Sequence, residues 1–286
     1  MNSRRLLLCT DLDRTLIPNG PQAEHPEARH HFRRLCCLPE VLLAYVTGRH
    51  QALVQQAISD YALPEPDFAI TDVGTQIYRV TDGGWMAIPR WQQEIGADWQ
   101  GGRRKQLQAW LSPLTELRLQ EASRQNRFKL SYYLSLDRDQ AWVMGDIENR
   151  LKQKGVNVSL IWSVDEQKNI GLIDVLPCKA TKLHALEFLQ RELGYQPHEV
   201  LFAGDSGNDL TVLGSAIRSV LVANASAEIK RQAQQLAAQN GQAESLYLAT
   251  ETASDWGGNY AAGILQGVWH FAPEFRDRLQ PPEGSP

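Results

Sequence analysis

Short apolar segments of strand length alternate with helical segments at both ends of this chain, and no other feature restricts the fold as strongly. The apolar segments lie at residues 6–10, 41–46, 68–71, 200–203 and 220–222. Helical spacing of apolar residues separates them. Strands joined by helices favour a parallel sheet with helices on both faces. We therefore expect an α/β fold whose core is a doubly wound, Rossmann-like parallel sheet.

The pattern changes in the middle of the chain, after a glycine-containing loop at residues 81–84. An alternating segment at 128–134 suits an antiparallel strand, and it is followed by a predicted helix and a further strand. We expect an inserted α+β cap domain at 83–167, with residues 1–82 and 168–286 forming the catalytic core domain. The pattern of the parallel sheet is expected to resume at 171–176.

Composition places the chain among ordinary globular proteins and excludes several classes of function. Of 286 residues, 43% are hydrophobic and 22% are charged, and the formal net charge is −4. A mildly acidic chain is a poor general binder of polyanions, so we expect no nucleic-acid partner. No apolar run approaches the roughly 20 residues that cross a bilayer, so we expect no membrane partner.

The first residues and the cysteines bear on the cellular compartment. Residues 6–10 are too short an apolar stretch for a signal peptide. The four cysteines match no zinc-binding spacing, and the adjacent Cys36 and Cys37 do not easily pair with each other. We therefore expect a cytoplasmic protein that is a monomer or a small homo-oligomer.

Two carboxylates, Asp11 and Asp13, directly follow the first apolar segment. At the carboxyl end of a buried parallel strand they would lie where open α/β sheets bind ligands. One carboxylate there can attack a phosphorus atom, and the other can protonate the leaving oxygen and then activate water. Two like charges so close also require a hard divalent cation with oxygen ligands. A solvated acidic turn has the same local pattern, so the pair alone leaves both interpretations open.

A glycine-rich segment at 204–209 follows another predicted strand. It contains Asp205, Asn208 and Asp209, whose side chains suit the remaining ligands of a magnesium ion. The same residue types also cap helices, so this segment alone does not decide the question.

Two weaker signals complete the set. The segment 47–49 offers the Thr47 hydroxyl and backbone amides to phosphoryl oxygens. Lys182, at the start of a predicted helix, can neutralise a transferring phosphoryl group. The four segments together supply a nucleophile, an acid/base, phosphate donors, a cation and metal ligands, and such a set in this order is improbable by chance.

The four motifs resemble those of the haloacid dehalogenase superfamily of phosphatases. In chain order they are Asp-Leu-Asp-Arg-Thr at 11–15, Thr-Gly-Arg at 47–49, Lys182, and Gly-Asp-Ser-Gly-Asn-Asp at 204–209. The long insertion resembles the cap of the sugar-phosphatase branch. Within that branch, stretches at 43–49, 72–78, 128–133 and 174–177 resemble sucrose-phosphate phosphatases.

The resemblance implies a Mg²⁺-dependent phosphatase that acts on a sugar phosphate. It implies Asp11 as the nucleophile and Asp13 as the acid/base. The implied ligands of the phosphate are Thr47, Gly48 and Lys182. The implied ligands of Mg²⁺ are the Asp11 side chain, the Asp13 backbone carbonyl and Asp205, with Asn208 and Asp209 in support.

The sugar-binding residues are less defined. Lys129 and Ser131 lie on a predicted cap strand, where strand alternation puts both on one side, and Arg49 follows the phosphate motif. These three are candidate substrate ligands, although Lys129 and Ser131 also fit an ordinary surface strand. Sucrose 6-phosphate is the first expected substrate.

Several alternatives stay open. The substrate could be mannosylfructose phosphate or a glycosyl-glycerate phosphate, and the chain could be a non-catalytic sugar-phosphate-binding subunit partnered with a glycosyltransferase. A phospho-accepting receiver module also uses acids, a hydroxyl and a lysine. Its phosphorylated aspartate usually follows a later strand, without a large insertion.

The chain departs from the family pattern at four places. Arg14 stands where the family usually has Asn or Gly, and Leu183 follows the motif lysine where Gly is usual. The stretch 163–171 is longer than the loop of sucrose phosphatases, and residues 256–260 are unlike theirs. These departures leave the predicted chemistry unchanged and the identity of the sugar open.

Overall fold

The structure is a computed structural model that describes residues 5–100, 104–165, 168–252 and 256–279. Within these ranges the strands are β1 (Leu6–Thr10), β2 (Val41–Val46), β3 (Phe68–Thr71), β4 (Gln76–Thr81), β5 (Gly84–Ala87), β6 (Arg118–Leu119), β7 (Leu130–Leu134), β8 (Val158–Asp165), β9 (Ile170–Pro177), β10 (Val200–Gly204), β11 (Arg218–Leu221) and β12 (Leu246–Leu248). The α-helices are α1 (Ala28–Cys36), α2 (Gln51–Asp60), α3 (Pro89–Gly96), α4 (Arg104–Leu111), α5 (Gln140–Gln153), α6 (Lys182–Leu193), α7 (Leu210–Leu213), α8 (Ala227–Gln239), α9 (Ala261–Phe271) and α10 (Glu274–Leu279). No helix in these ranges is both long enough and apolar enough to cross a membrane.

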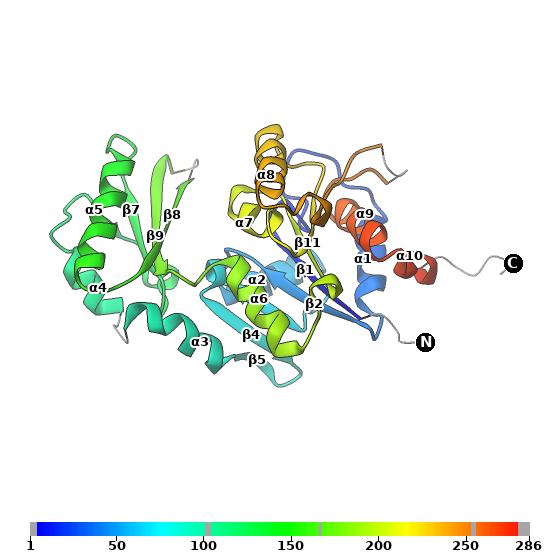
Figure 1. Ribbon diagram of the computed structural model, residues 1–286, viewed down its shortest axis with the longest axis horizontal. Coiled ribbons are helices and arrows are strands. Elements are labelled where there is room, and N and C mark those ends of the chain that lie inside the picture. Colours follow the sequence, from blue (N-terminus) through cyan, green and yellow to red (C-terminus); the bar gives the residue numbers. More distant parts are fainter. Residues whose placement is uncertain (1–4, 101–103, 166–167, 253–255, 280–286) are drawn as a thin grey trace, which may run out of the picture.

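The larger sheet has eight strands in the order β12-β11-β10-β1-β2-β3-β4-β5 (Figure 1). The six strands from β12 to β3 pair in parallel, and β4 and β5 add antiparallel strands at one edge. The chain leaves β1 toward β2 and later returns to β10, on the other side of β1. Ligands of open α/β sheets bind at such a reversal of strand order, beyond the carboxyl ends of the strands. The predicted α/β fold class with a doubly wound parallel core is confirmed.

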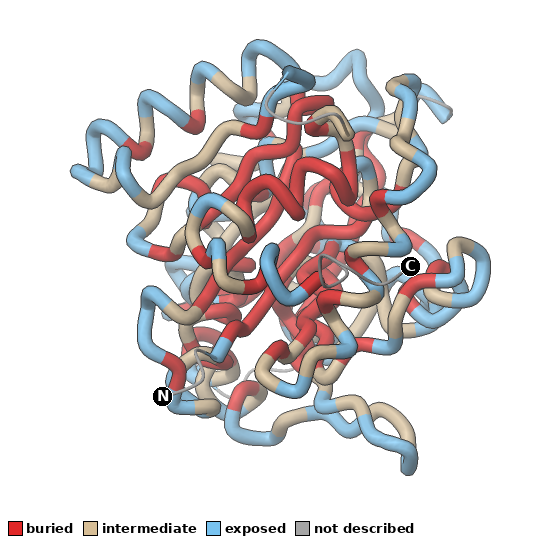
Figure 2. The backbone as a smooth tube through the Cα atoms, turned by 90° about the vertical axis from the view of Figure 1, so that its right-hand side faces the viewer, coloured by how far each residue is buried: buried red, intermediate tan, exposed pale blue. Residues whose placement is uncertain are grey.

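Helices cover both faces of this sheet because its strands are apolar on both faces. In β1, Leu7 and Cys9 belong to the hydrophobic cluster that contains residues of α6, α7 and α8, whereas Leu6 and Leu8 belong to the cluster with α1, α2 and α9. Figure 2 shows the burial concentrated in the strands and the inner helix faces. The acidic segments that end the strands are thereby held on a rigid base.

The second sheet is antiparallel and has the strand order β6-β7-β9-β8. One of its faces packs on α4 and α5, where Leu130, Ile173 and Val175 share a cluster with Val143 and Ile147. Figure 1 shows this sheet with its two helices to one side of the larger sheet. The opposite face of the second sheet is free to form one wall of a pocket.

Strand pairing corrects one expectation from the sequence. Residues 171–176 were expected to continue the parallel sheet, but β9 pairs antiparallel with β7 and β8 in the second sheet. At the other end of the insertion, β5 still pairs with β4 in the larger sheet. The second sheet therefore extends to Pro177, beyond the boundary expected at 167. The assignment of 83–167 as a separate cap domain stays a prediction.

A tight turn at the end of β3, η1 (Asp72–Gly74), lies against the start of α6. Asp72 and Val73 both have positive φ, at 50° and 60°. Gly74 has φ 95°, and a Cβ built there would lie 2.7 Å from the backbone carbonyl carbon of Thr181, the residue before Lys182. Only glycine lets the turn approach the helix start so closely.

We predict that Gly74→Ala lowers the free energy of unfolding by roughly 2–4 kcal/mol, because it adds backbone strain and a backbone collision. Gly84→Ala is the matched control, since Gly84 has φ 105° but no atom lies within 4 Å of the position that an alanine methyl would take there. It should cost only the strain, roughly 1–2 kcal/mol. Urea unfolding of both variants measures the difference. Equal costs would show that the approach to Thr181 is not tight.

Candidate active site

Three loops and one helix start meet at the carboxyl edge of the larger sheet. Asp11 and Asp13 follow β1, Thr47 follows β2, Asp205 follows β10, and α6 begins with Lys182. The Thr181 side chain caps α6 by accepting a hydrogen bond from the His184 backbone amide. The cap fixes where the helix begins, and hence where Lys182 enters the site.

The Lys182 ammonium is buried among three side chains. Its Nζ donates to Asp11 Oδ2 at 2.8 Å, to Asp209 Oδ1 at 2.8 Å and to Asn208 Oδ1 at 3.1 Å. Burial alone would lower the pKa of Lys182, but the Asp11 and Asp209 carboxylates outweigh it and raise that pKa. The ammonium therefore stays charged in a site where only 2% of the residue is exposed.

Two carboxyl groups of the site have raised pKa values. Burial raises the pKa of Asp11 to about 7, with Lys182 opposing the rise and Asp209 adding to it. Burial and the charge of Asp209 raise the pKa of Asp205 to about 6. Both shifts reflect carboxylates that are crowded together away from water.

Hydrogen bonds hold the Asp205 loop in a compact form. Asp209 Oδ2 accepts from the backbone amides of Asp205 and Ser206, at 3.1 Å each. Asp205 Oδ1 accepts from the Thr15 hydroxyl at 3.0 Å. A Cβ at Gly204 would lie 2.6 Å from the Asp209 carboxyl carbon, so the loop requires glycine there. The Asp209 carboxylate is thus largely used by the loop and by Lys182.

The carboxylates suit a divalent cation. Asp11, Asp205 and Asp209 each place one oxygen within 4.8 Å of the others, and all three residues are buried. Clustered carboxylate oxygens are the donors that hard divalent cations prefer. The crowding that raises the pKa of Asp11 and of Asp205 is what such a cation would relieve. The residues present therefore fit a magnesium-type ion.

Asp13 points toward a different partner. The Arg49 guanidinium donates two hydrogen bonds to the Asp13 carboxylate, from Nε to Oδ2 at 2.8 Å and from Nη2 to Oδ1 at 2.6 Å. Asn19 Nδ2 also donates to Asp13 Oδ1, at 2.7 Å. Burial opposes the effect, but the bonds and charge of Arg49 lower the pKa of Asp13. The Asp13 carboxylate is oriented by Arg49 and Asn19, and its backbone carbonyl remains the group predicted to bind metal.

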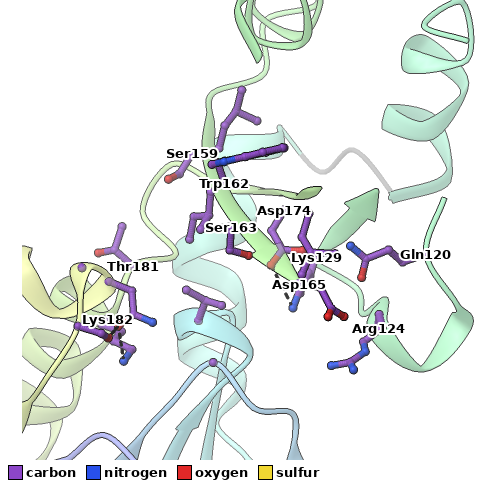
Figure 3. A pocket seen from close by; sticks show the side chains of 18 of the residues that line it. Gln120, Arg124, Lys129, Ser159, Trp162, Ser163, Asp165, Asp174, Thr181 and Lys182 are labelled. Atoms are coloured by element: carbon purple, nitrogen blue, oxygen red, sulfur yellow. Dashed lines mark hydrogen bonds and ion pairs between the residues drawn. The ribbon is translucent and has the colours of Figure 1, made fainter. Parts of the chain in front are cut away.

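A cavity of about 760 Å³ joins this edge of the larger sheet to the open face of the second sheet. Gly48, Lys182 and Asn208 line one end, and Lys129 and Asp174 line the other. Figure 3 shows Thr181 and Lys182 across the cavity from Lys129 and Asp174. A volume in this range holds a small organic ligand.

The far wall carries a small polar network. Lys129 Nζ lies 3.3 Å from Asp174 Oδ2, and the Ser131 hydroxyl donates to Asp174 Oδ1. Lys129 and Ser131 are thus brought together, as the alternation of the strand predicted. Ser131 is fully buried behind Asp174, so Asp174 and Lys129 are the groups offered to the cavity.

The structure gathers most of the residues predicted from the sequence. Asp11, Lys182, Asp205, Asn208 and Asp209 share one site, through the hydrogen bonds of Lys182 and the cluster of carboxylates. Thr47 is buried and its hydroxyl accepts from the Arg49 amide at 3.2 Å. Their roles as nucleophile, phosphate ligands and metal ligands remain predictions.

Sequence reasoning assigned no role to three residues of the site, and it gave Asn224 only a possible polar role at the edge of the sheet. Asp174 was passed over because β9 was assigned to the wrong sheet, and its pairing with Ser131 was the missing information. Asn19, Thr15 and Asn224 act through hydrogen bonds to distant or backbone partners. No spacing pattern in the chain signals those contacts.

The fold and this arrangement define a hydrolase of the haloacid dehalogenase type. A haloacid dehalogenase-like hydrolase from Bacillus subtilis has the same fold, with a TM-score of 0.66 over 93% of this chain and 91% of its own, at 16% identity. A family model described as sucrose-6F-phosphate phosphohydrolase matches residues 4–272. The chain belongs to the sucrose-6F-phosphate phosphohydrolase family, and thus to the phosphoric monoester hydrolases.

Individual relatives agree with this assignment. The sucrose-phosphatase from Synechocystis sp. PCC6803, solved with sucrose and phosphate, has a TM-score of 0.72 and 28% identity, over 94% of this chain and 98% of its own. A HAD-like hydrolase of Nitrosococcus oceani is 48% identical over 96% of this chain and 73% of its own length. Sucrose-phosphatase 1 of Nicotiana tabacum is 30% identical over 94% of this chain, which spans only 60% of the tobacco protein.

We predict that the metal-free protein loses stability as the pH rises through about 7, because of Asp11. The pKa of Asp11 is higher in the folded chain than its ordinary value near 3.8, so folding favours the protonated form. That contribution is fully present below the ordinary value and is lost as the pH rises through the folded value.

The measurement is urea unfolding between pH 4 and 8 in a chelator, for the wild type and for Asp11→Asn. The wild type should lose stability relative to the variant as the pH rises, because Asn does not titrate. A constant difference across this range would contradict the buried position of the Asp11 carboxyl.

Proposed function

We propose that this protein is a Mg²⁺-dependent phosphatase that hydrolyses the phosphate monoester of a disaccharide, with sucrose 6-phosphate as the first candidate. The observation that carries the proposal is the cavity that Lys182 lines at one end, where it holds the buried Asp11, and that the Lys129–Asp174 pair lines at the other end. The Synechocystis sucrose-phosphatase that was solved with sucrose and phosphate supports the choice of substrate.

In the proposed reaction an Asp11 carboxylate oxygen attacks the phosphorus atom. The bond between phosphorus and the sugar oxygen breaks, and that oxygen takes a proton from Asp13. Since Arg49 holds Asp13 as a carboxylate in the free site, Asp13 must first take up this proton when the substrate binds. A water molecule then attacks the phosphoryl group on Asp11 and gives a proton to Asp13. Inorganic phosphate leaves, and the Asp11 carboxylate is restored. Leu12 already donates its amide to Asp11 Oδ1 at 2.7 Å, which holds the carboxylate in one orientation.

The remaining residues of the phosphate end would bind and neutralise charge. Thr47, Gly48 and Lys182 would donate to the phosphoryl oxygens. Mg²⁺ would be held by the Asp11 side chain, the Asp13 backbone carbonyl and Asp205, with Asn208 and Asp209 in support. When bound, the ion supplies charge neutralisation for the phosphoryl group and for the crowded carboxylates.

The second sheet would select the sugar. Lys129 and Asp174 offer a donor and an acceptor to sugar hydroxyls, while Ser131 orients Asp174 from behind. The sequence suggested Arg49 as a substrate ligand. Its guanidinium already donates two hydrogen bonds to Asp13, so it would affect the substrate by orienting Asp13. Closure of the second sheet, together with α4 and α5, over the site would exclude water from the phosphoryl step.

A second group of substrates has its own support. The glucosylglycerol-phosphate synthase of Pseudomonas anguilliseptica is 27% identical over 217 residues, which are 76% of this chain and 26% of that protein. The phosphate esters of other glycosides, mannosylfructose phosphate and glycosyl-glycerate phosphates among them, are therefore the next candidates. Partnership with a glycosyltransferase, cytoplasmic location and a monomeric or small oligomeric state remain part of the proposal.

A substrate panel tests the function. Phosphate release is measured for sucrose 6-phosphate, mannosylfructose phosphate, a glycosyl-glycerate phosphate and glycerol 3-phosphate, with Mg²⁺ and with a chelator. We expect turnover of a disaccharide ester only with Mg²⁺, and at least a ~10³-fold loss of kcat in Asp11→Asn, since the nucleophile is removed. Absence of turnover for every ester would refute the proposal, and wild-type rates in Asp11→Asn would refute the assignment of the nucleophile.

Lys129→Met tests whether the Lys129–Asp174 pair binds the sugar. The change removes the ammonium and keeps a side chain of similar length. We predict a rise in KM for the disaccharide phosphate of roughly 10–100-fold, the value of a hydrogen bond to a charged group. The KM for glycerol 3-phosphate should stay unchanged, because that ester does not reach the wall. Lys152→Met, on the exposed side of α5, is the control. Equal effects on both esters would place Lys129 outside the sugar site.

A further inference from the structure

Arg14, one of the four departures from the family pattern, has a backbone conformation that its side chain disfavours. It has φ 58° and lies between Asp13 and Thr15. Left-handed backbone is costly for a residue with a Cβ, and such strain persists only where the surroundings impose it. The question is what holds Arg14 there.

Two asparagine side chains hold the peptide groups on both sides of Arg14. The Arg14 amide donates to Asn19 Oδ1 at 2.8 Å, and Asn224 Nδ2 donates to the Arg14 carbonyl at 2.6 Å. Asn224 is 4% exposed and comes from the loop after β11, 210 positions away. Its Oδ1 accepts from the Tyr260 amide at 2.9 Å, so both ends of its amide are used.

Tyr260 connects a second family departure, residues 256–260, to the same point. It is fully buried and has φ 51°. Its side chain lies against the loop that follows Arg14, because a Cβ on Gly20 would lie 2.7 Å from the Tyr260 hydroxyl. The two departures are therefore joined in space through Asn224.

The left-handed residue shapes the turn that carries Asp13. After Arg14 the chain folds back, and the amides of Thr15, Leu16 and Ile17 all donate to the Leu12 carbonyl at 2.8–3.2 Å. This return brings the Thr15 hydroxyl to Asp205 Oδ1. Asn19, which binds the Arg14 amide, also binds the Asp13 carboxylate.

We infer that Asn224 is a positioning residue for the reaction, which acts by holding Arg14 in the left-handed conformation and thereby orienting Asp13 and Asp205. The inference rests on the proposed phosphatase function. Without its donor, the Arg14 carbonyl loses the Asn224 bond. Only the Asn19 bond to the Arg14 amide and the 3.7 Å approach of Arg14 Nε to Asp205 Oδ2 then oppose relaxation of the strained residue. The turn then releases both the acid/base and the Thr15 contact to Asp205.

Asn224→Asp breaks the Arg14 contact, keeps the Tyr260 contact and adds a negative charge. A carboxylate keeps an acceptor for the Tyr260 amide and loses the donor to the Arg14 carbonyl. We expect kcat for the disaccharide phosphate to fall 10–100-fold, with KM changed less than threefold. Asn240→Asp is a control for the added charge and for the loss of this kind of bond, since Asn240 Nδ2 donates to the Gly214 carbonyl at 2.8 Å, far from the site. Asn240 is exposed, whereas Asn224 is buried. The control variant should lower the melting temperature and leave kcat unchanged.

A rescue experiment tests the route through Arg14. Glycine takes the left-handed conformation without steric cost, so a glycine at position 14 does not need the hydrogen bond from Asn224 to stay in it. Asn224→Ala should lower kcat at least 10-fold with Arg14 present and less than threefold in the Arg14→Gly background. An equal loss in both backgrounds, or wild-type kcat in Asn224→Asp, would overturn the inference.

Thermal unfolding of the same four proteins, the wild type, Asn224→Ala, Arg14→Gly and the double variant, tests the same coupling without a substrate. The drop in melting temperature caused by Asn224→Ala should be smaller in the Arg14→Gly background, and equal drops would again overturn the inference. If the wild type hydrolyses glycerol 3-phosphate but no sugar phosphate, the proposal of a disaccharide substrate is wrong. The effect of the Asn224 variants on kcat is then measured with glycerol 3-phosphate. If no ester is hydrolysed, the proposed function fails, and thermal unfolding still decides whether Asn224 holds Arg14.

Discussion

The burial of the Lys182 ammonium is the interaction on which the site depends. A buried charge is tolerated only with close partners of opposite sign, and Asp11 and Asp209 provide them at 2.8 Å. With Asp205, three carboxylates face the buried ammonium and the half-exposed Arg14, whose Nε lies 3.7 Å from Asp205 Oδ2, so negative charge is left in excess. A phosphate dianion would be repelled by that excess. The Mg²⁺ ion that we propose would relieve this repulsion when a phosphate ester approaches Asp11.

Lys182 lies 171 positions from Asp11 in the sequence. Their contact therefore depends on how a long stretch of chain between them is positioned. The second sheet is inserted between them, and α6 must return to one position against the larger sheet. The η1 turn fixes that position. Its Gly74 lies against Thr181, and its Val73 amide donates to the Thr47 carbonyl at 3.2 Å. The phosphate motif after β2 and the lysine at the start of α6 are thus held by one strained turn.

The sequence allowed the larger sheet and the chemical end of the site to be predicted, because both follow from local patterns. Apolar runs ending in acids mark buried strands with their ligand edge, as in β1 and β10. The assignment of β9 failed because Ile170–Pro177 is largely apolar, and such a run fits a parallel core strand as well as a strand of the second sheet. Only the pairing of β9 with β7 and β8 shows that it belongs to the second sheet and not to the parallel core. The contacts of Asn19 and Asn224 were beyond prediction because they are made to the backbone of Arg14, and side-chain type does not reveal such contacts.

The two ends of the cavity differ in how freely they can change. At the end of the cavity that Lys182 lines, the side chains hydrogen-bond to one another, so a substitution at Asp209 would disturb both Lys182 and the Asp205 loop. At the sugar end, Lys129 and Asp174 pair mainly with each other and with Ser131. The Asn126 side chain donates to the Thr75 hydroxyl at 2.9 Å, which joins the second sheet to the residue following η1. Under the proposed function, Lys129 and Asp174 could therefore vary with the sugar while the groups around Asp11 stay the same.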